Sequence, residues 1–267
     1  LAMGVKRMLK KRTLIRRLYS VETLGETNVI CCDKTGTLTK NEMTVRNLFV
    51  NNQDYTVSGD GYSTNGVISL YGKQFNKKDN FILEVGALCN NAELNLSSKE
   101  SSITGDPTEA ALLVSAMKAG LNYRELRENF TKVDELPFDS ERKMMSTVHK
   151  SSKGYVLYSK GAPERILARC NHILINGRVV ALKEEERKKI LEQNKQYAKQ
   201  ALRVLAFAYK NVKTEKKNNE KDLIFVGLQG MIDPPKKEIK EYITNSRNAG
   251  IRVIMITGDN LYTAIAV

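Results

Sequence analysis

NVICCDKTGTLT, residues 28–39, decides the fold. Its first part, Asn28 to Cys32, is a short, apolar, β-branched run that predicts a buried parallel strand. Asp33 follows at the carboxyl end of this strand, and the residues after it predict a flexible turn whose backbone and hydroxyl groups can hold phosphate and magnesium. A carboxylate in that place can attack phosphorus and form an acyl phosphate. For a lone aspartate after a strand, a simple helix or turn cap would be the favoured interpretation.

A second run of the same kind, RVIMI at Arg252–Ile256, ends at TGD, residues 257–259. Before it lies a stretch typical of a helix, Lys236–Ala249, with Gly250 as its stop. Each of the two expected strands therefore delivers a polar motif at its carboxyl end, where open α/β sheets place their active sites. The two pieces bracket a long segment of different character, so we expect one domain inserted into another.

The segment from about Thr44 to Gly227 mixes strands and helices, which indicates an α+β insert. The expected strands are Thr44–Val50, Lys143–His149, Tyr155–Ser159, Val204–Tyr209 and Leu223–Leu228. The expected helices are Phe81–Asn91, Pro107–Ala119, Pro163–Cys170 and Lys183–Leu202. The very polar run 210–222 predicts a surface loop.

Composition limits the class of protein. With 267 residues, 41% of them hydrophobic, the chain can bury a sizeable core. No stretch approaches the roughly 18 to 20 apolar residues of a membrane helix, and no signal peptide opens the chain. The four cysteines lack the spacing of a zinc site and are expected to be reduced, partly buried thiols of a cytosolic protein: Cys31, Cys32, Cys89 and Cys170.

The net charge of +13 is concentrated at the start of the chain, where residues 1–18 predict a basic helix. Seven cations precede the first acid: Lys6, Arg7, Lys10, Lys11, Arg12, Arg16 and Arg17. Three interpretations stay open: a nucleic-acid arm, a juxtamembrane segment on the cytoplasmic side, and a solvated helix face. A nucleic-acid arm would need interleaved aromatic residues, and Tyr19 is the only one nearby. Both ends of the chain lie in helix-like runs without stop signals, so we expect an excised fragment.

DKTGTLT at Asp33–Thr39 resembles the phosphorylation signature of P-type ATPases, a family within the haloacid-dehalogenase-like superfamily. Three more motifs follow the family's pattern: KGAPE at Lys160–Glu164, MIDPP at Met231–Pro235 and TGD at Thr257–Asp259. Seven consecutive matching residues outweigh the capping interpretation of Asp33. The resemblance implies an α/β fold: a haloacid-dehalogenase-like, Rossmann-type phosphorylation domain, truncated, with a large inserted α+β nucleotide-binding domain. It also implies that ATP and Mg²⁺ bind.

The resemblance implies one set of catalytic residues: Asp33, Lys34, Thr35, Thr257, Gly258 and Asp259. Asp33 would be the nucleophile, and Thr35 would lend its backbone carbonyl to the metal, so both are expected metal ligands. Thr257 and Gly258 would contact the phosphoryl group. Phosphoryl transfer needs in-line positioning and neutralisation of spread negative charge, so these roles agree with the chemistry.

The resemblance also implies a set of nucleotide-site residues: Glu109, Phe138, Lys143, Lys160, Gly161, Arg203 and Asp233. Phe138 would stack on adenine and Lys160 would line the same pocket. Glu109 would receive the adenine amino group, while Lys143 and Arg203 would reach the phosphates. The alternatives are a core position for Phe138 and plain surface charges for Glu109, Lys143 and Arg203.

Three further residues have a structural alternative. Gly161 has no Cβ and would let the backbone approach the base, yet a plain turn glycine would look the same. Asp233 and Asp259 would organise the site near the nucleotide and its magnesium, or would only cap the turns beside their neighbours. Lys236 stands where the family commonly has arginine; it keeps the charge but loses the bidentate fork.

The family resemblance divides the chain into four parts: a stalk helix segment, 1–18; the first part of the phosphorylation domain, 19–43; the nucleotide-binding domain, 44–228; and an incomplete second part, 229–267. In the family, the phosphorylation domain continues past TGD to a further lysine and a Gly-Asp-Gly motif followed by Asn-Asp, and neither follows TGD in this sequence. We therefore expect very weak or absent autophosphorylation by the chain on its own, with nucleotide binding retained.

The implied function is ATP-driven cation transport through an aspartyl phosphate, and GDPTEAALL with PFDSERKMMS most resembles the bacterial calcium-transporting group. The expected partners are ATP, a cation held by membrane helices outside this chain, and the membrane, but no nucleic acid, with the chain itself a monomer. The expected location is the cytoplasmic face of the cell membrane. The alternative is a soluble phosphatase or phosphomutase of the same superfamily, which usually has an acid two residues after the nucleophile, where this chain has Thr35.

Overall fold

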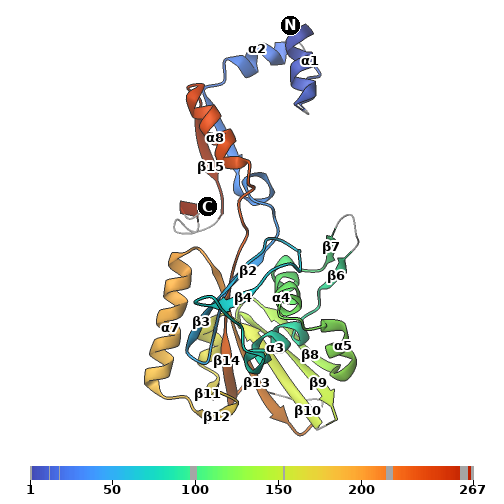
Figure 1. Cartoon of the computed structure of the whole chain (residues 1–267), viewed down its shortest axis with the longest axis vertical. Coiled ribbons are helices and arrows are strands. Elements are labelled where there is room, and N and C mark those ends of the chain that lie inside the picture. Colours follow the sequence, from blue (N-terminus) through green and yellow to red (C-terminus); the bar gives the residue numbers. More distant parts are fainter. Residues whose placement is uncertain are drawn as a thin grey trace. The chain divides into compact units, whose positions relative to one another are not determined.

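The computed structural model describes residues 2–11, 13–17, 19–96, 101–152, 154–214, 219–258 and 264–265. The chain divides into two compact units, shown in Figure 1. The small unit consists of residues 1–40 and 235–258, and the large unit of residues 41–234 and 259–267. None of the helices in the described ranges has both the length and the apolar character that a bilayer crossing requires.

The small unit is built around two parallel strands. Its elements are α1 (Ala2–Lys10), α2 (Tyr19–Gly25), β1 (Val29–Asp33), the turn η1 (Lys34–Leu38), α8 (Ile239–Asn248) and β15 (Arg252–Ile256). β1 and β15 pair in parallel, with Val29 opposite Arg252 at one end and Asp33 opposite Ile256 at the other. The predicted strand at 252–256 forms with its predicted bounds, and β1 lies one residue later than predicted. The predicted burial of both strands is wrong: their residues alternate between exposed and half-buried, because in the described residues the two strands form a sheet of their own.

The prediction of one basic helix over residues 1–18 is wrong in its second half. α1 ends at Lys10, and residues 13–15 have no helical structure. The backbone N–H of Thr13 bonds the carbonyl of Met8 at 2.9 Å, which closes the last turn of the helix. Thr13 and Ile15 are β-branched and lose side-chain freedom in a helix, so the sequence there favours extended backbone.

One large sheet forms the large unit. Nine of its strands follow the order β5-β4-β3-β2-β14-β13-β10-β9-β8, and β11 joins at β14 with β12 beside it. All pairs are antiparallel except β11 with β14. The strands are β2 (Thr44–Val50), β3 (Gln53–Val57), β4 (Ile68–Leu70), β5 (Lys73–Gln74), β8 (Thr131–Asp139), β9 (Met144–Ser151), β10 (Gly154–Gly161), β11 (Cys170–Ile175), β12 (Arg178–Ala181), β13 (Arg203–Val212) and β14 (Leu223–Ile232). A separate hairpin consists of β6 (Glu93–Leu96) and β7 (Ser101–Thr104).

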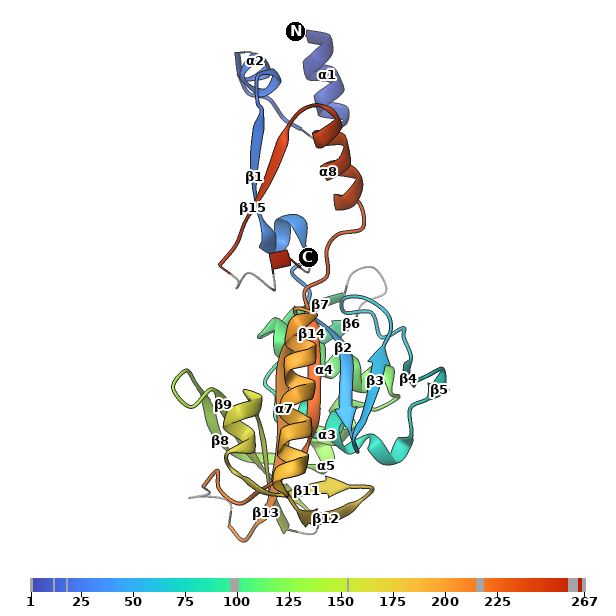
Figure 2. The same cartoon turned by 90° about the vertical axis from the view of Figure 1, so that its left-hand side faces the viewer.

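Helices cover both faces of this sheet, as Figure 2 shows for α7 on one side and α3 and α4 on the other. They are α3 (Phe81–Leu88), α4 (Pro107–Lys118), α5 (Tyr123–Asn129), α6 (Pro163–Leu167) and α7 (Glu184–Lys199), with a short turn η2 (Lys77–Asp79) before α3. Neighbouring residues of β14 enter different cores: Val226 packs in the core that includes α3 and α4, and Phe225 in the one that includes α6 and α7. This is the alternation that a strand between two layers requires.

The expected mixed α/β architecture with a sheet-rich insert is confirmed. Strand β2 has the predicted bounds, and β10, β13 and β14 extend the predicted strands by a few residues. β9 begins one residue later than predicted, which leaves Lys143 in the turn before it, and ends two residues later. The predicted helices also form, and each is shorter than predicted at one or both ends. The surface loop predicted for residues 210–222 is wrong in part. β13 continues to Val212, and Glu220 is buried, where its carboxylate accepts hydrogen bonds from Arg142 in the turn between β8 and β9 and from Ser146 in β9.

Candidate functional site

The two phosphate-type motifs lie at the same edge of the small unit. Asp33 is the last residue of β1 and is paired with Ile256, the last residue of β15. Thr257 and Gly258 follow directly, so a side chain after β15 starts beside the end of β1. Asp259, which was predicted to belong to the same set, lies outside the described residues. Adjacent parallel strands thus bring the predicted nucleophile and the start of TGD together.

The turn after Asp33 is closed by its own hydrogen bonds. The backbone N–H and the hydroxyl of Thr39 both donate to the carbonyl of Lys34, at 3.0 and 3.1 Å, and Gly36 N–H donates to the Thr39 hydroxyl at 3.2 Å. Gly36 has a φ of 75°, a conformation that glycine adopts without a steric penalty. Lys34 is buried within this turn. The loop immediately after the predicted nucleophile is therefore held in one conformation by hydrogen bonds within residues 34–39.

Lys236 also stabilises this loop. Its ammonium donates to the carbonyl of Gly36 at 2.7 Å, and its backbone N–H donates to the carbonyl of Leu38 at 2.9 Å. A lysine in place of arginine predicts that any ion pair at this position is less directional, and the structure gives the lysine a hydrogen bond to a backbone carbonyl. One ammonium proton is enough for that bond, so the guanidinium fork is not required here.

The predicted metal ligands are oxygen donors: the carboxylate of Asp33 and the backbone carbonyl of Thr35. Oxygen ligands are the kind that Mg²⁺ prefers, and it usually takes only one or two carboxylates from the protein. The described residues contain no group of three or more His, Cys, Asp or Glu side chains that could hold a metal ion. The donor set fits magnesium chemically and supplies two ligands.

In the large unit, three neighbouring strands gather most of the predicted nucleotide residues at one end of the sheet. Lys143 lies in the turn between β8 and β9, and Lys160 and Gly161 end β10, with Gly161 opposite Met144. Phe138 lies in β8 where the pairing with β9 shifts register, and its side chain is 65% exposed. The core alternative for Phe138 is therefore wrong, because a large aromatic ring is left on the surface.

Glu109 and Lys160 form a shielded ion pair. Their side chains are 14% and 8% exposed, and Lys160 Nζ lies 2.6 Å from Glu109 Oε1. The other carboxylate oxygen of Glu109 accepts the backbone N–H of Asn91 at 2.9 Å. Glu109 is held there by the start of α4, where Asp106 accepts the N–H groups of Thr108 and Glu109. The plain surface-charge interpretation of Glu109 is therefore wrong.

The pair also affects a neighbouring thiol. Burial raises the pKa of Cys89, and the positive charge of Lys160 opposes that effect. Cys89 is fully buried and donates to the carbonyl of Met145, which is opposite Lys160 across the strands. A buried cysteine with a raised pKa is an inert packing residue.

Gly161 is required by close strand packing. A Cβ there would lie 2.5 Å from the carbonyl oxygen of Lys143 and 2.5 Å from the Cβ of Met144. Lys143 itself is exposed and has a φ of 54°, which is uncommon for a residue with a side chain. Arg203, the first residue of β13, is also exposed and donates to the hydroxyl of Thr108 at 3.1 Å. Thr108 is the residue before Glu109 in α4, so this bond brings Arg203 close to the ion pair.

Asp233 is buried at the end of β14 and accepts the backbone N–H of Glu42 at 3.2 Å. It lies near a tyrosine: burial, and then the negative charges of Glu42, Asp233 and Asp106, raise the pKa of Tyr62 to about 12. The carboxylate is thus fixed by the backbone where the chain leaves the large unit.

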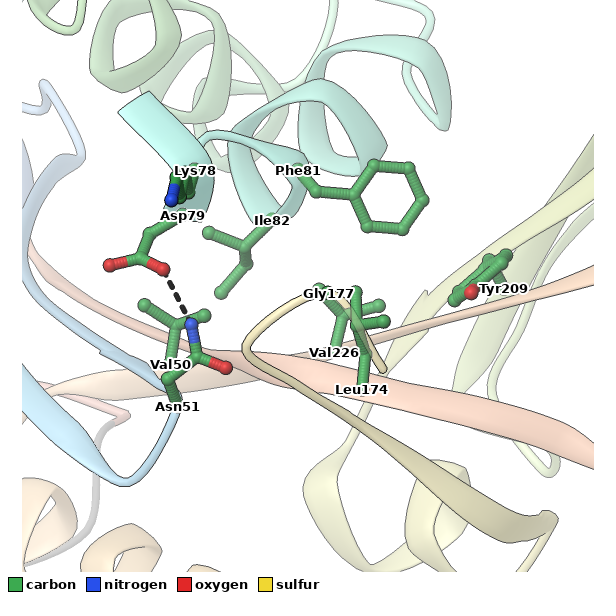
Figure 3. Close-up of a pocket in the computed structure, with 10 residues that line it drawn as sticks. All are labelled: Val50, Asn51, Lys78, Asp79, Phe81, Ile82, Leu174, Gly177, Tyr209 and Val226. Carbon is green, nitrogen blue, oxygen red and sulfur yellow. Dashed lines mark hydrogen bonds between the residues drawn. The ribbon is translucent and has the colours of Figure 1, made fainter. Parts of the chain in front are cut away.

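Two cavities of the large unit have none of the predicted nucleotide residues in their walls. One, of about 270 Å³, lies between the start of α3 and the turn from β11 to β12; Figure 3 shows Asp79 bonded to Asn51 on one side and the rings of Phe81 and Tyr209 on the other. The other, of about 260 Å³, is lined by residues that include Asn91 and His149. The exposed ring of Phe138 lines neither of these two cavities.

Sequence reasoning missed the residues that support the site from behind. Asn91 follows α3 and holds Glu109 through its backbone, which no side-chain pattern reveals. Arg142 and Glu220 form an ion pair with N and O atoms 2.5 Å apart, although they are 78 residues apart in the sequence. The charged loop around Glu220 gave no signal, because the buried acid looks like its solvated neighbours.

A family model described as "P-type ATPase, cytoplasmic domain N" matches residues 80–238. The whole chain is 44% identical to "Calcium-transporting ATPase 1" of Bacillus cereus and 41% identical to "Calcium-transporting ATPase lmo0841" of Listeria monocytogenes, in each case over 271 residues. It is 37% identical over 276 residues to the human "Calcium-transporting ATPase type 2C member 1". The chain spans 29% of the length of each of these three relatives. Because the family model covers more than half of the chain, the protein belongs to the P-type ATPase family and contains its cytoplasmic domain N.

Proposed function

We propose that this chain is the catalytic part of an ATP-driven cation pump, in which Asp33 takes the γ-phosphate of ATP. The main support for this proposal is the parallel pairing of β1 and β15, which places Asp33 opposite Ile256, the residue before Thr257. Two polar motifs at the ends of neighbouring parallel strands are the arrangement that a phosphoryl-transfer site in an open α/β sheet needs. The small unit is accordingly a haloacid-dehalogenase-like phosphorylation domain.

The two units divide the labour. The large unit binds ATP, with adenine on the exposed ring of Phe138 and the Glu109–Lys160 pair beside it, while Lys143 and Arg203 reach the phosphates. Asp33 is the nucleophile, and Lys34, Thr35, Thr257, Gly258 and Asp259 complete the phosphoryl site. Asp33 and Thr35 hold Mg²⁺, which when bound neutralises charge on the phosphates. Asp233 organises the site near the nucleotide.

The proposed domain limits differ from the bounds of the two compact units by a few residues at each boundary. The nucleotide-binding domain spans residues 44–228; the phosphorylation domain spans 19–43 and 229–267, and residues 1–18 belong to a stalk. The basic start of the chain suits a segment on the cytoplasmic side of a membrane, since lysine and arginine are enriched there. The whole pump is then an integral membrane protein, and this part of it lies at the cytoplasmic face.

Calcium is the proposed cation. Support comes from three relatives, two bacterial and one human, that carry the name calcium-transporting ATPase. The phosphatase or phosphomutase alternative is not favoured, because those relatives match the chain over its whole length. Thr35 in place of a second acid also suits a long-lived aspartyl phosphate, since no carboxylate at that position activates water.

Asp33→Asn in the full-length pump tests the proposal. The amide is nearly the same size but is no nucleophile, so acid-stable ³²P incorporation from labelled ATP should fall to background. Nucleotide binding should stay, because it takes place in the other unit. Asp134→Asn, in β8, is the matched control and should be phosphorylated normally. Phosphoenzyme formation by Asp33→Asn at the control level would refute the proposed role of Asp33.

A further inference from the structure

A buried carboxylate lies behind the turn between β8 and β9. Glu220 is 8% exposed, and its two carboxylate oxygens have separate partners: Oε2 accepts from Arg142 at 2.5 Å and Oε1 from the hydroxyl of Ser146 at 2.7 Å. Ser146 also shares a hydrogen bond of 2.8 Å with Ser159 of β10. Glu220 therefore ties the polar segment before β14 to two strands of the nucleotide site.

Arg142 carries the connection into the turn. One end of its guanidinium bonds Glu220, and the other donates to the carbonyl of Pro137, the residue before Phe138. The planar guanidinium makes these bonds from two separate nitrogens held in a fixed geometry, whereas an ammonium has to make them from one nitrogen on a flexible stem. The Arg142–Glu220 pair thus holds the backbone on the two sides of the turn, next to Phe138 on one side and next to Lys143 on the other.

The turn needs such support, because it includes a strained residue. Lys143 has a φ of 54°, and residues with a side chain keep such a conformation only where their surroundings impose it. Asp139 caps the turn by accepting the N–H groups of Glu141 and Arg142 at 3.0 and 2.8 Å. The carbonyl of Lys143 accepts the N–H of Ala162 at 2.9 Å. These bonds hold the backbone within the turn. The two bonds of Arg142 attach the turn to Pro137 in β8 and to Glu220.

We propose that Arg142 and Glu220 are positioning residues, which hold Phe138 and Lys143 in the geometry that binds ATP. The inference rests on the proposed function, since it assumes that those two residues contact the nucleotide. Neither Arg142 nor Glu220 has to touch ATP. Their effect is to remove the conformational freedom that an exposed turn would otherwise lose on binding.

A fluorescent reporter at the site separates positioning from folding. The chain contains no tryptophan, so F138W in the 267-residue chain places a single indole where adenine is expected to stack. Its emission should change on titration with ATP. ATP binding by the unaltered chain is measured by calorimetry. If neither the unaltered chain nor F138W binds ATP, the proposed function fails at its nucleotide-binding step. That failure is distinct from a failure of the positioning role.

E220Q and R142K, each combined with F138W, then test the pair. Loss of a hydrogen bond between charged partners should raise the Kd for ATP about tenfold. It should also lower the anisotropy of the indole without ATP, which a loss of overall stability in folded protein would not do. The double variant should bind no more weakly than the single ones, because both changes release the same turn. R142K keeps the charge and decides the matter if E220Q does not fold.

D60N is the matched control, since Asp60 pairs with Arg46 and the exposed fractions of the Arg46 and Arg142 side chains are 29% and 28%. This pair lies away from the turn, so D60N with F138W should leave the Kd and the anisotropy unchanged. The positioning role is overturned if folded R142K binds ATP as tightly as the F138W parent with the same anisotropy. It is equally overturned if D60N weakens binding as much as R142K does.

Discussion

The two units differ most in what their strands bury. β1 and β15 alternate between exposed and half-buried residues, and among the described residues of the small unit only Lys34, Leu38 and Thr39 are buried. In β14 of the large unit, eight of the ten residues are buried, in two cores on the two faces of the sheet. The chemistry is thus proposed for the unit with the smaller core, and the binding for the unit with the larger one.

The difference indicates unequal stability. Burial of apolar surface is the dominant favourable contribution to folding, so a unit whose strands bury no residue has little to set against the loss of backbone freedom. The large unit has its own cores and is expected to fold and bind nucleotide without help. Its buried cores suit a rigid binding surface. The small unit has low local stability, which is typical of the segments that move in proteins.

Hydrogen exchange should give the largest contrast. Amides in β1 and β15, such as those of Cys31 and Ile254, should exchange about a thousandfold faster than those of Phe207 and Phe225 in the large sheet. Their opening needs no disruption of a buried core. Exchange measured by NMR or mass spectrometry on the 267-residue chain checks this. Equal protection of the two sets of amides would mean that the chain opens as one cooperative body. The proposed difference in stability between the two units would then be wrong.

Two phenylalanines of the large unit sharpen the comparison between folding and binding. Phe207 is fully buried, so Phe207→Ala should lower the free energy of unfolding by about 3–5 kcal/mol. Phe138 is 65% exposed, so Phe138→Ala should leave stability nearly unchanged but weaken ATP binding by about 1–3 kcal/mol through lost stacking. Urea unfolding and ATP titration measure the two effects. A large loss of stability in Phe138→Ala would show that its ring belongs to the core after all.

Sequence reasoning was most successful where one physical pattern decides the structure. The runs at 44–50 and 252–256 are strands with the predicted bounds, because short segments rich in β-branched residues favour extended backbone. Burial was predicted less well, since β15 has no buried residue. β8 was missed: it contains Pro137 and the exposed Phe138, and a proline is a poor strand residue. Its register shift around Phe138 comes from pairing with β9, which no local pattern encodes.

The site shows the same limit. Motifs identified the residues, and the structure brings Glu109 and Lys160 into an ion pair across 51 residues of sequence. The roles of these residues toward ATP stay predictions, as do those of Asp33 and Thr257. Supporting groups such as Glu220 and the backbone of Asn91 could not be predicted, because their importance comes from burial and hydrogen bonding that only tertiary structure creates.

A smaller effect concerns pH and should be confined to the large unit. Burial lowers the pKa of His149 below 6.5; the charges of Lys132 and Arg127 add to this, against an opposing hydrogen bond to the Phe130 carbonyl. Below pH 6.5 the unfolded chain therefore takes up a proton that the folded chain does not bind. The free energy of unfolding of the large unit is thus expected to be at its full value above that pH and to fall as the pH drops.

Urea unfolding of the large unit between about pH 7.5 and about pH 5.5 measures the slope. His149→Gln removes the titrating group and should flatten it, while keeping a side chain that can bond the Phe130 carbonyl. His172, the other histidine of the chain, is exposed, so His172→Gln is the matched control and should keep the slope of the unaltered protein. If His172→Gln flattened the slope and His149→Gln did not, the pH dependence would come from the surface of the sheet. Burial of a histidine in the core would then not account for it.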